Sequence, residues 1–164
     1  MLNFPAHDYL DRLGISYERG SFPPETEKGA ANVAACFGLR ARQMVKTLIF
    51  EIDSGERILV MVGGDQNVVS GHLKKVVGSR NIQLASADAV MQTTGYRIGS
   101  IPPFSWQTEV FRSFLDVFLM GETILGVGAG VWGNEIFITP SNLVTASRAY
   151  VVNLTDRDRP VFPE

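Results

Sequence analysis

The sequence predicts an α+β fold. Short strands and short helices follow one another without the regular strand-helix-strand alternation of a doubly wound parallel sheet. Two apolar, β-branched runs, at 45–52 and 57–62, are separated by Asp53-Ser54-Gly55-Glu56, which is typical of an antiparallel hairpin. The chain has 164 residues, 45% of them hydrophobic and 20% charged, which suits one compact core. We expect a single domain over residues 1–155 and a loosely ordered, charged and proline-bearing tail over 156–164.

In the first third of the chain, glycines and prolines mark the ends of the elements. A helix is expected over 5–13, where Gly14 stops it, and an extended segment over 15–19. After a loop at 22–24, apolar side chains at helical spacing predict a second helix over 29–37, ended by Gly38. Cys36 is expected in the core on this helix. As the one cysteine of the chain, it permits no intramolecular disulfide.

The later elements follow from capping residues and apolar spacing. A helix over 70–77 would turn Leu73, Val76 and Val77 inward, and Ser86 can cap a further helix through residue 92, because its hydroxyl accepts from free amides of the first turn. The last third predicts strands at 115–119, 123–127, 135–139 and 150–154. The helix between the last two, over 140–146, begins with a proline, as is common at this position.

Charge and composition limit the function classes. The net charge of −2 and the pI near 5.7 lack the basic excess of an obligate nucleic-acid binder, so any contact with RNA must be local, and no DNA partner is expected. The start of the chain has no signal-peptide pattern and no apolar run of membrane-spanning length, which predicts a cytoplasmic protein without a membrane partner. With His7 and His72 beside the one cysteine, no metal-ligand spacing is recognisable, and no cofactor is expected.

The segment 128–133 matches the dinucleotide-binding pattern G-x-G-x-x-G. That pattern must open a helix whose N-terminus receives a pyrophosphate, whereas the segment that follows is strand-like and ends at Pro140. The dinucleotide interpretation therefore fails. The glycines either make a tight turn or allow backbone amides to approach a substrate carbonyl.

Three separated segments carry the functional signal. They are an apolar strand with one lysine (Val45-Lys46-Thr47-Leu48-Ile49-Phe50), the turn-rich Thr94-Gly95-Tyr96-Arg97-Ile98-Gly99-Ser100-Ile101-Pro102-Pro103, and Gly126-Val127-Gly128-Ala129-Gly130. In this order they resemble the YbaK/ProX family of aminoacyl-tRNA deacylases, which includes the editing domain of bacterial prolyl-tRNA synthetases, over about residues 27–152. The resemblance implies a mixed, barrel-like β-sheet flanked by short helices. It also implies a trans-editing deacylase that hydrolyses the ester of mischarged tRNA.

The resemblance also implies site residues. Taken alone, a lysine in this strand could alternate outward to solvent, but in the family it points into the pocket and binds substrate. Ser100 replaces a frequent second glycine, and alanine at 129 leaves only backbone to act there, as an oxyanion donor. The expected catalytic set is Lys46, Gly99, Gly128, Ala129 and Gly130. Downstream, Asp116 and Leu119 resemble the family's D-x-x-L strand, for which we expect a structural role.

Two further groups of residues are expected around the catalytic residues, one for the substrate and one for the tRNA. The expected substrate-binding residues, whose aromatic members could equally be core, are Thr47, Gly95, Tyr96, Ser100, Ile101, Phe37, Tyr17 and Phe22, with Phe104 as a further wall. The expected tRNA contacts, which could equally be solvated surface, are Arg40, Arg42, Lys74, Lys75 and Arg97.

The sequence has no plausible Ser-His-Asp set. This agrees with an ester hydrolysis in which no side chain of the protein acts as the nucleophile. An aminoacyl ester is already activated, and a positioned water or the neighbouring ribose hydroxyl can supply the attack. The expected partners are the acceptor end of mischarged tRNA and an aminoacyl-tRNA synthetase. Two alternatives stay open: a non-catalytic module that binds aminoacyl-tRNA or a synthetase, and a hydrolase of small-molecule esters.

Overall fold

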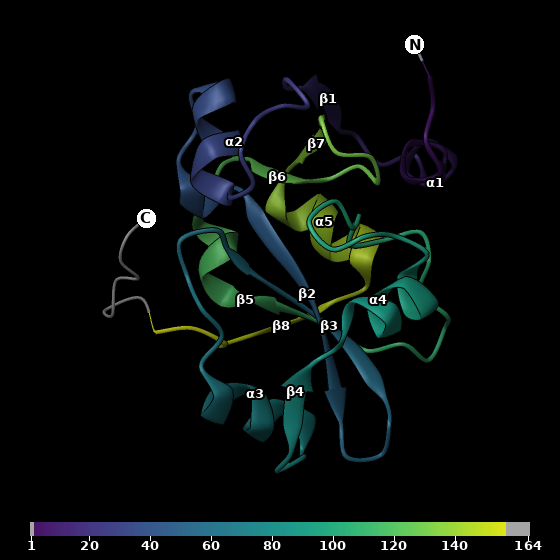
Figure 1. Ribbon diagram of the computed structural model, residues 1–164, viewed down its shortest axis with the longest axis vertical. Coiled ribbons are helices and arrows are strands. Elements are labelled where there is room, and N and C mark those ends of the chain that lie inside the picture. The colour runs from purple at the N-terminus through teal and green to yellow at the C-terminus, as the bar shows by residue number, and fades with distance from the viewer. Residues whose placement is uncertain (1, 157–164) are drawn as a thin grey trace.

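The computed structural model describes residues 2–156 and shows helices packed around two β-sheets (Figure 1). The helices are α1 (Pro5–Leu13), α2 (Ala30–Phe37), α3 (Ser70–Val77), α4 (Ala87–Thr94) and α5 (Pro140–Ser147), with short 3-10 turns η1 (Ala41–Gln43) and η2 (Val117–Gly121). The strands are β1 (Glu18–Ser21), β2 (Val45–Ile52), β3 (Arg57–Gly63), β4 (Ile82–Leu84), β5 (Ser113–Asp116), β6 (Leu125–Gly128), β7 (Asn134–Ile138) and β8 (Tyr150–Val152). Most of the tail expected over 156–164 lies outside the described residues.

Both sheets mix local and distant strands. The smaller sheet has the order β1-β7-β6 and is antiparallel. The larger has the order β4-β2-β3-β5-β8, in which β2 pairs antiparallel with β3 and β4, while β3, β5 and β8 run parallel. The α+β class and the hairpin of β2 and β3 are confirmed.

The sheets do not close into a barrel, which corrects the barrel-like expectation. An isolated bridge between Met44 and Gly126 links them. On the side of β2 away from β3, β4 pairs only with Phe50–Ile52. Between these two contacts, residues 45–48 of β2 have no strand partner on this side among the described residues, and we call this stretch the open edge of β2.

The packing of the core explains why the sequence of β3 is a continuous apolar run. Leu59 and Met61 face a cluster that also takes side chains from α1, α5, β6 and β7, so this cluster joins the two sheets. On the opposite face, Ile58 and Val60 pack with α3 through Leu73. A strand buried on both faces needs apolar residues at every position. Within residues 2–156, no helix combines the length and the apolar character that a membrane span requires.

Most predicted helix ends are confirmed, because they depend on local chemistry. Gly14, Gly38 and Gly78 end their helices in the left-handed conformation. The Ser86 hydroxyl accepts from the Ala89 amide at 3.1 Å and begins α4, and a proline opens α5.

Two local expectations are wrong, and one strand was not expected. The strand predicted over 115–119 ends at Asp116 and continues as η2. Strand β4 was missed, because a strand of three residues, with Ile82 half-buried and the other two exposed, gives no periodic signal. Cys36 is exposed rather than buried, and its thiol donates to the Asn32 carbonyl. Adjacent helical residues lie about 100° apart, so Cys36 is about 200° around the helix from the buried Ala34 and lies outside the face centred between Val33 and Ala34.

Asp116 has the structural role expected of it. Its carboxylate is buried and accepts from the Leu154 amide at 2.8 Å and from the Thr155 hydroxyl at 2.7 Å. Charge-assisted hydrogen bonds of this kind hold the chain after β8 against β5.

Candidate functional site

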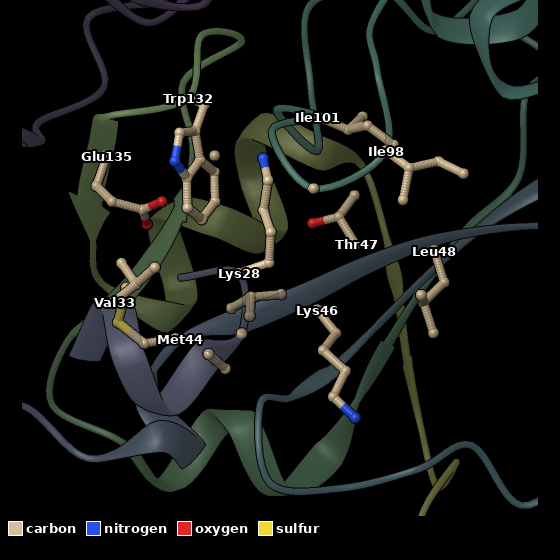
Figure 2. Close-up of a pocket in the computed structure, with 15 residues that line it drawn as sticks. Lys28, Val33, Met44, Lys46, Thr47, Leu48, Ile98, Ile101, Trp132 and Glu135 are labelled. Carbon is tan, nitrogen blue, oxygen red and sulfur yellow. The ribbon is translucent and has the colours of Figure 1, made fainter. Parts of the chain in front are cut away.

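A cavity of about 200 Å³ lies along the open edge of β2 (Figure 2). Four segments that are distant in sequence form its walls: the approach to α2, the start of β2, the loop at 98–101, and the turn between β6 and β7. The lining residues are Lys28, Gly29, Ala30, Val33, Met44, Val45, Lys46, Thr47, Leu48, Ile98, Gly99, Ile101, Gly128, Trp132 and Glu135. Of the residues predicted from sequence, Lys46, Thr47, Gly99, Ile101 and Gly128 line this one cavity.

The glycine run allows the 96–101 loop to pack on β6. A Cβ at Gly128 would lie 2.8 Å from the carbonyl carbon and oxygen of Ser100, and one at Gly130 would lie 2.7 Å from the Tyr96 ring. The Gly130 amide donates to the Ser100 carbonyl at 2.8 Å, so in this arrangement it is not free for a substrate. Ala129 is buried in the core that joins the sheets. Gly99, in contrast, has a φ of 101° and open space around its Cα.

Lys46 lines the cavity but holds its ammonium to one side. Nζ donates to the Gln66 backbone carbonyl and, at 3.3 Å, to Asn67 Oδ1, both in the loop that follows β3. Figure 2 shows this ammonium directed away from Thr47 and Glu135. Burial lowers the pKa of Lys46, and the nearby Asp65 carboxylate opposes this shift. Release from the loop would leave the ammonium free to meet a charge that develops in the cavity.

The neighbouring residue, Thr47, points to the other side of β2 (Figure 2). Its hydroxyl is buried and has no hydrogen-bond partner among the described residues. A buried hydroxyl without a partner costs about 1–3 kcal/mol. A residue that lines the cavity therefore carries an unsatisfied hydroxyl beneath the cavity surface.

Glu135 is a functional candidate that sequence reasoning missed. Its side chain is buried in β7, and desolvation raises its pKa to about 8. The carboxyl is therefore mostly protonated at neutral pH. The available signal was an acid directly before three apolar residues in the strand Asn134-Glu135-Ile136-Phe137-Ile138.

Lys28, also missed, lies at the mouth of the cavity. Its ammonium is 3.7 Å from the centroid of the Trp132 ring, and Trp132 is itself anchored by a hydrogen bond from Nε1 to the Pro24 carbonyl at 3.0 Å. The contact between a cation and an indole face is attractive. Because Lys28 is exposed, water competes with this contact. The sequence signal was weak, because Lys28 belongs to a loop without a recognisable pattern.

Several predicted substrate-binding residues do not line the cavity. Phe22 packs against Trp132 with ring centroids 4.9 Å apart, and Phe37 packs against Phe22 and Phe137, so both support the wall from behind. Tyr17 stacks on His7 and donates to Asp11. Gly95 ends α4, Tyr96 and Ser100 contact the glycine run, and Phe104 is in the core.

The predicted tRNA contacts fall in different regions. Arg40 and Arg42 flank the start of η1, and Arg42 shares a small hollow with Asp65 and Gln66, next to the loop that holds Lys46. Arg97 is exposed in the loop whose later residues line the cavity. Lys74 and Lys75 are exposed on α3, and Figure 1 shows this helix far from α2. Lys74 shares a groove with Glu51, which is about 17 Å along β2 from Lys46 at a strand's rise per residue.

Known proteins share both sequence and fold with this chain. The family model of the aminoacyl-tRNA editing domain matches residues 24–146. Proline–tRNA ligases of Staphylococcus aureus strains Newman and JH1 are each 33% identical over 109 residues, which is 66% of this chain and 19% of the ligase. The match thus spans about a fifth of the length of these curated relatives.

Two solved structures extend the likeness to the fold. A candidate trans-editing enzyme for prolyl tRNA synthetase is 26% identical with a TM-score of 0.85, covering 95% of this chain and 99% of that one. A hypothetical protein that is 24% identical, also with a TM-score of 0.85, covers 93% and 100% and is similar in fold.

Proposed function

Because the chain belongs to the aminoacyl-tRNA editing domain family, we propose that it hydrolyses the ester of mischarged tRNA, acting in trans. A role in aminoacyl-tRNA editing follows from the membership itself. The proposal adds the reaction, the residues that carry it, and the substrate: a wrongly attached amino acid on the 3′ adenosine, presented at the open edge of β2.

The observation that carries the proposal is the size and position of the cavity. Its volume of about 200 Å³ is below the roughly 300–1,000 Å³ of sites that enclose a whole small-molecule ligand. An aminoacyl group can enter such a space, while the adenosine and the rest of the tRNA stay outside. A small pocket also rejects a larger, correctly attached amino acid by its walls more strongly than contacts could select a smaller one.

In the proposed reaction, the oxygen of a water molecule adds to the ester carbonyl carbon. The bond from this carbon to the ribose oxygen then breaks, and the ribose oxygen takes up a proton. The free amino acid leaves as a carboxylate once its own acid proton is lost. We assign to Lys46 the stabilisation of the negative charge that gathers on the carbonyl oxygen or lies on the terminal phosphate, after its ammonium leaves Gln66. Gly99, with open space around it, would allow the substrate to approach the backbone closely.

The test is deacylation of a panel of tRNAs, each charged with a different amino acid, by the purified protein. Lys46→Ala should lower kcat/KM at least about tenfold, which corresponds to about 1.4 kcal/mol of lost transition-state stabilisation. Arg80→Ala removes an exposed cation that we assign to no contact with substrate or tRNA, and this control should keep wild-type turnover. Tight binding of charged tRNA without turnover would indicate a non-catalytic module. Turnover of small esters alone, without salt-sensitive RNA binding, would indicate a small-molecule hydrolase.

The basic residues give a separate test of RNA contact. Charge reversal at Lys74 and Lys75 should weaken tRNA binding and flatten its salt dependence, while hydrolysis of a short aminoacyl-ester mimic stays nearly unchanged. The same reversal at Arg40 and Arg42, closer to the cavity, should have the larger effect on tRNA. Equal loss on both substrates for either pair would place that pair in the catalytic site or in support of the fold.

A further inference from the structure

Glu135 is an acid that the reaction proposed above leaves unused. It is the one acidic residue that lines the cavity within the described part of the chain. The residue is 8% exposed and, across residues 2–156, its carboxyl has neither a hydrogen bond nor an ion pair. Burying an ionisable group without a partner is costly, and a group left in this state inside a cavity is satisfied when a ligand supplies the partner.

Glycines on the two neighbouring strands place no side chain beside this carboxyl. In the sheet register, Glu135 pairs with Gly20 on β1 and with Gly128 on β6, so neither neighbouring strand places a side chain beside it. A Cβ at Gly126 would lie 3.3 Å from Glu135 Oε2. Figure 2 shows the carboxyl turned toward the side of the cavity where Trp132 and Lys28 lie. The carboxyl is therefore within reach of a group that enters the cavity.

We propose that Glu135 binds the α-amino group of the aminoacyl ester, so that the cavity takes esters with a free α-amine and rejects N-acylated ones. This inference rests on the proposed function, because it assumes that an aminoacyl group enters the cavity. The α-amine is the one basic donor that every primary aminoacyl ester carries, whatever its side chain. Glu135 would thus recognise the class of substrate, while the apolar wall would select its size.

The proton balance of this pair suits a buried site. An α-amino group has a pKa of about 7.7–8.0, and burial raises the pKa of Glu135 to about 8. At neutral pH the unbound carboxyl and the unbound ammonium each hold one titratable proton, two in all. The bound pair, a carboxylate beside an ammonium, holds one titratable proton. It therefore buries no net charge. Binding at pH 7 therefore releases about one proton.

The other charged groups at the cavity favour the same state. Lys28 and Lys46 are the two cations that line it within residues 2–156, one over the Trp132 ring and the other on the Gln66 carbonyl. Both disfavour a further ammonium unless Glu135 is ionised. The residues that α2 contributes, Ala30 and Val33, and the glycines of β1 and β6 carry no titratable group.

Non-hydrolysable analogues test this proposal apart from turnover. We would measure binding of 3′-glycylamino-3′-deoxyadenosine and its N-acetyl derivative by isothermal titration calorimetry, in two buffers of different ionisation enthalpy at pH 7. Glycine has no side chain that a small pocket could exclude. The free-amine analogue should bind the wild type at least tenfold more tightly and release about one proton. Its affinity should fall about tenfold per pH unit below pH 7 and should be greatest near pH 8.

Glu135→Gln should reduce the preference for the free amine to about twofold or less and abolish the proton release. Glu18→Gln, which changes an exposed acid on β1, is the control and should behave as wild type. Equal binding of the two analogues by the wild type, binding without proton release, or binding of neither analogue would each overturn the inference. The wild-type measurements do not depend on the folding of a variant. If the tRNA panel shows no turnover but the amine preference is present, the proposed function fails and the inference stands.

Discussion

Substitution of Gly128 by alanine should destabilise the protein and displace the loop over the cavity. The added Cβ would lie 2.8 Å from the carbonyl carbon and oxygen of Ser100 and 3.0 Å from the carbonyl oxygen of Ile101. Real Cβ atoms do not approach backbone so closely, and backbone cannot rotate away as the end of a side chain can. The loop or β6 must therefore shift. Overpacking of this kind typically costs about 1–3 kcal/mol.

For a chain of 164 residues, each kcal/mol changes Tm by about 2–4 °C, so Gly128→Ala should lower Tm by about 2–12 °C. Thermal unfolding followed by circular dichroism measures the shift, and deacylation of the best tRNA of the panel measures the effect on the site. Activity should fall more than the fraction of folded protein, because Gly99 and Ile101 move with the loop.

The matched control is Gly71→Ala. Gly71 lies in α3, has no atom within 4 Å of an added Cβ and has no left-handed φ, so alanine there should leave stability unchanged or raise it by up to about 1 kcal/mol. If Gly128→Ala unfolds within about 1 °C of the wild type and retains full activity, the reasoning that the glycine run seats the loop is refuted.

Thr47→Val should raise stability by up to about 1 kcal/mol, because it removes a buried hydroxyl without a partner, but it should lower deacylation if this hydroxyl contacts the substrate. Ser113→Ala, which removes another such hydroxyl, in β5, should raise stability without affecting activity, and chemical unfolding with deacylation assays compares the two. Asp116→Ala should cost about 3 kcal/mol or more in the free energy of unfolding, measured in urea, since it leaves the buried Leu154 amide and Thr155 hydroxyl without their acceptor. Burial raises the pKa of Glu135 from 4.5 to about 8, so the folded state holds this proton more tightly than the unfolded state; stability should fall as pH rises from about 4.5 to 8, and Glu135→Gln should flatten this fall in urea midpoints measured against pH.

The elements that could be predicted from the sequence are those that short-range chemistry determines. The hairpin of β2 and β3 has its turn residues between two apolar runs, and Ser86 caps α4 with its own hydroxyl. The extent of β5 could not be predicted, because the chain leaves the strand at Asp116, whose hydrogen bonds reach residues nearly forty positions away.

The residues of the candidate site also divide into those that could be predicted from the sequence and those that could not. Lys46, Gly99 and Gly128 were found because the family resemblance carried them, and the structure brings them to one cavity. The sequence shows that Glu135 is an acid next to apolar residues, but it does not show its raised pKa, which depends on how β1, β6 and β7 bury it together. Lys28 is a candidate only because its ammonium lies over Trp132, more than a hundred residues later in the chain. Such relations exist only after folding.

The open edge of β2 has a consequence for the local stability of the fold. An edge without a strand partner ordinarily invites pairing with another chain, but here the edge forms the floor of a concave space that a neighbouring molecule's strand would have to enter. It is also the place where a single backbone bridge links the strands of the two sheets, so opening fluctuations should concentrate there. A ligand that fills the cavity would touch both sheets at once and tie them together. Amide hydrogens on β2 and β6 should then become slower to exchange with solvent as one cooperative unit, although the two strands are more than seventy residues apart in the chain.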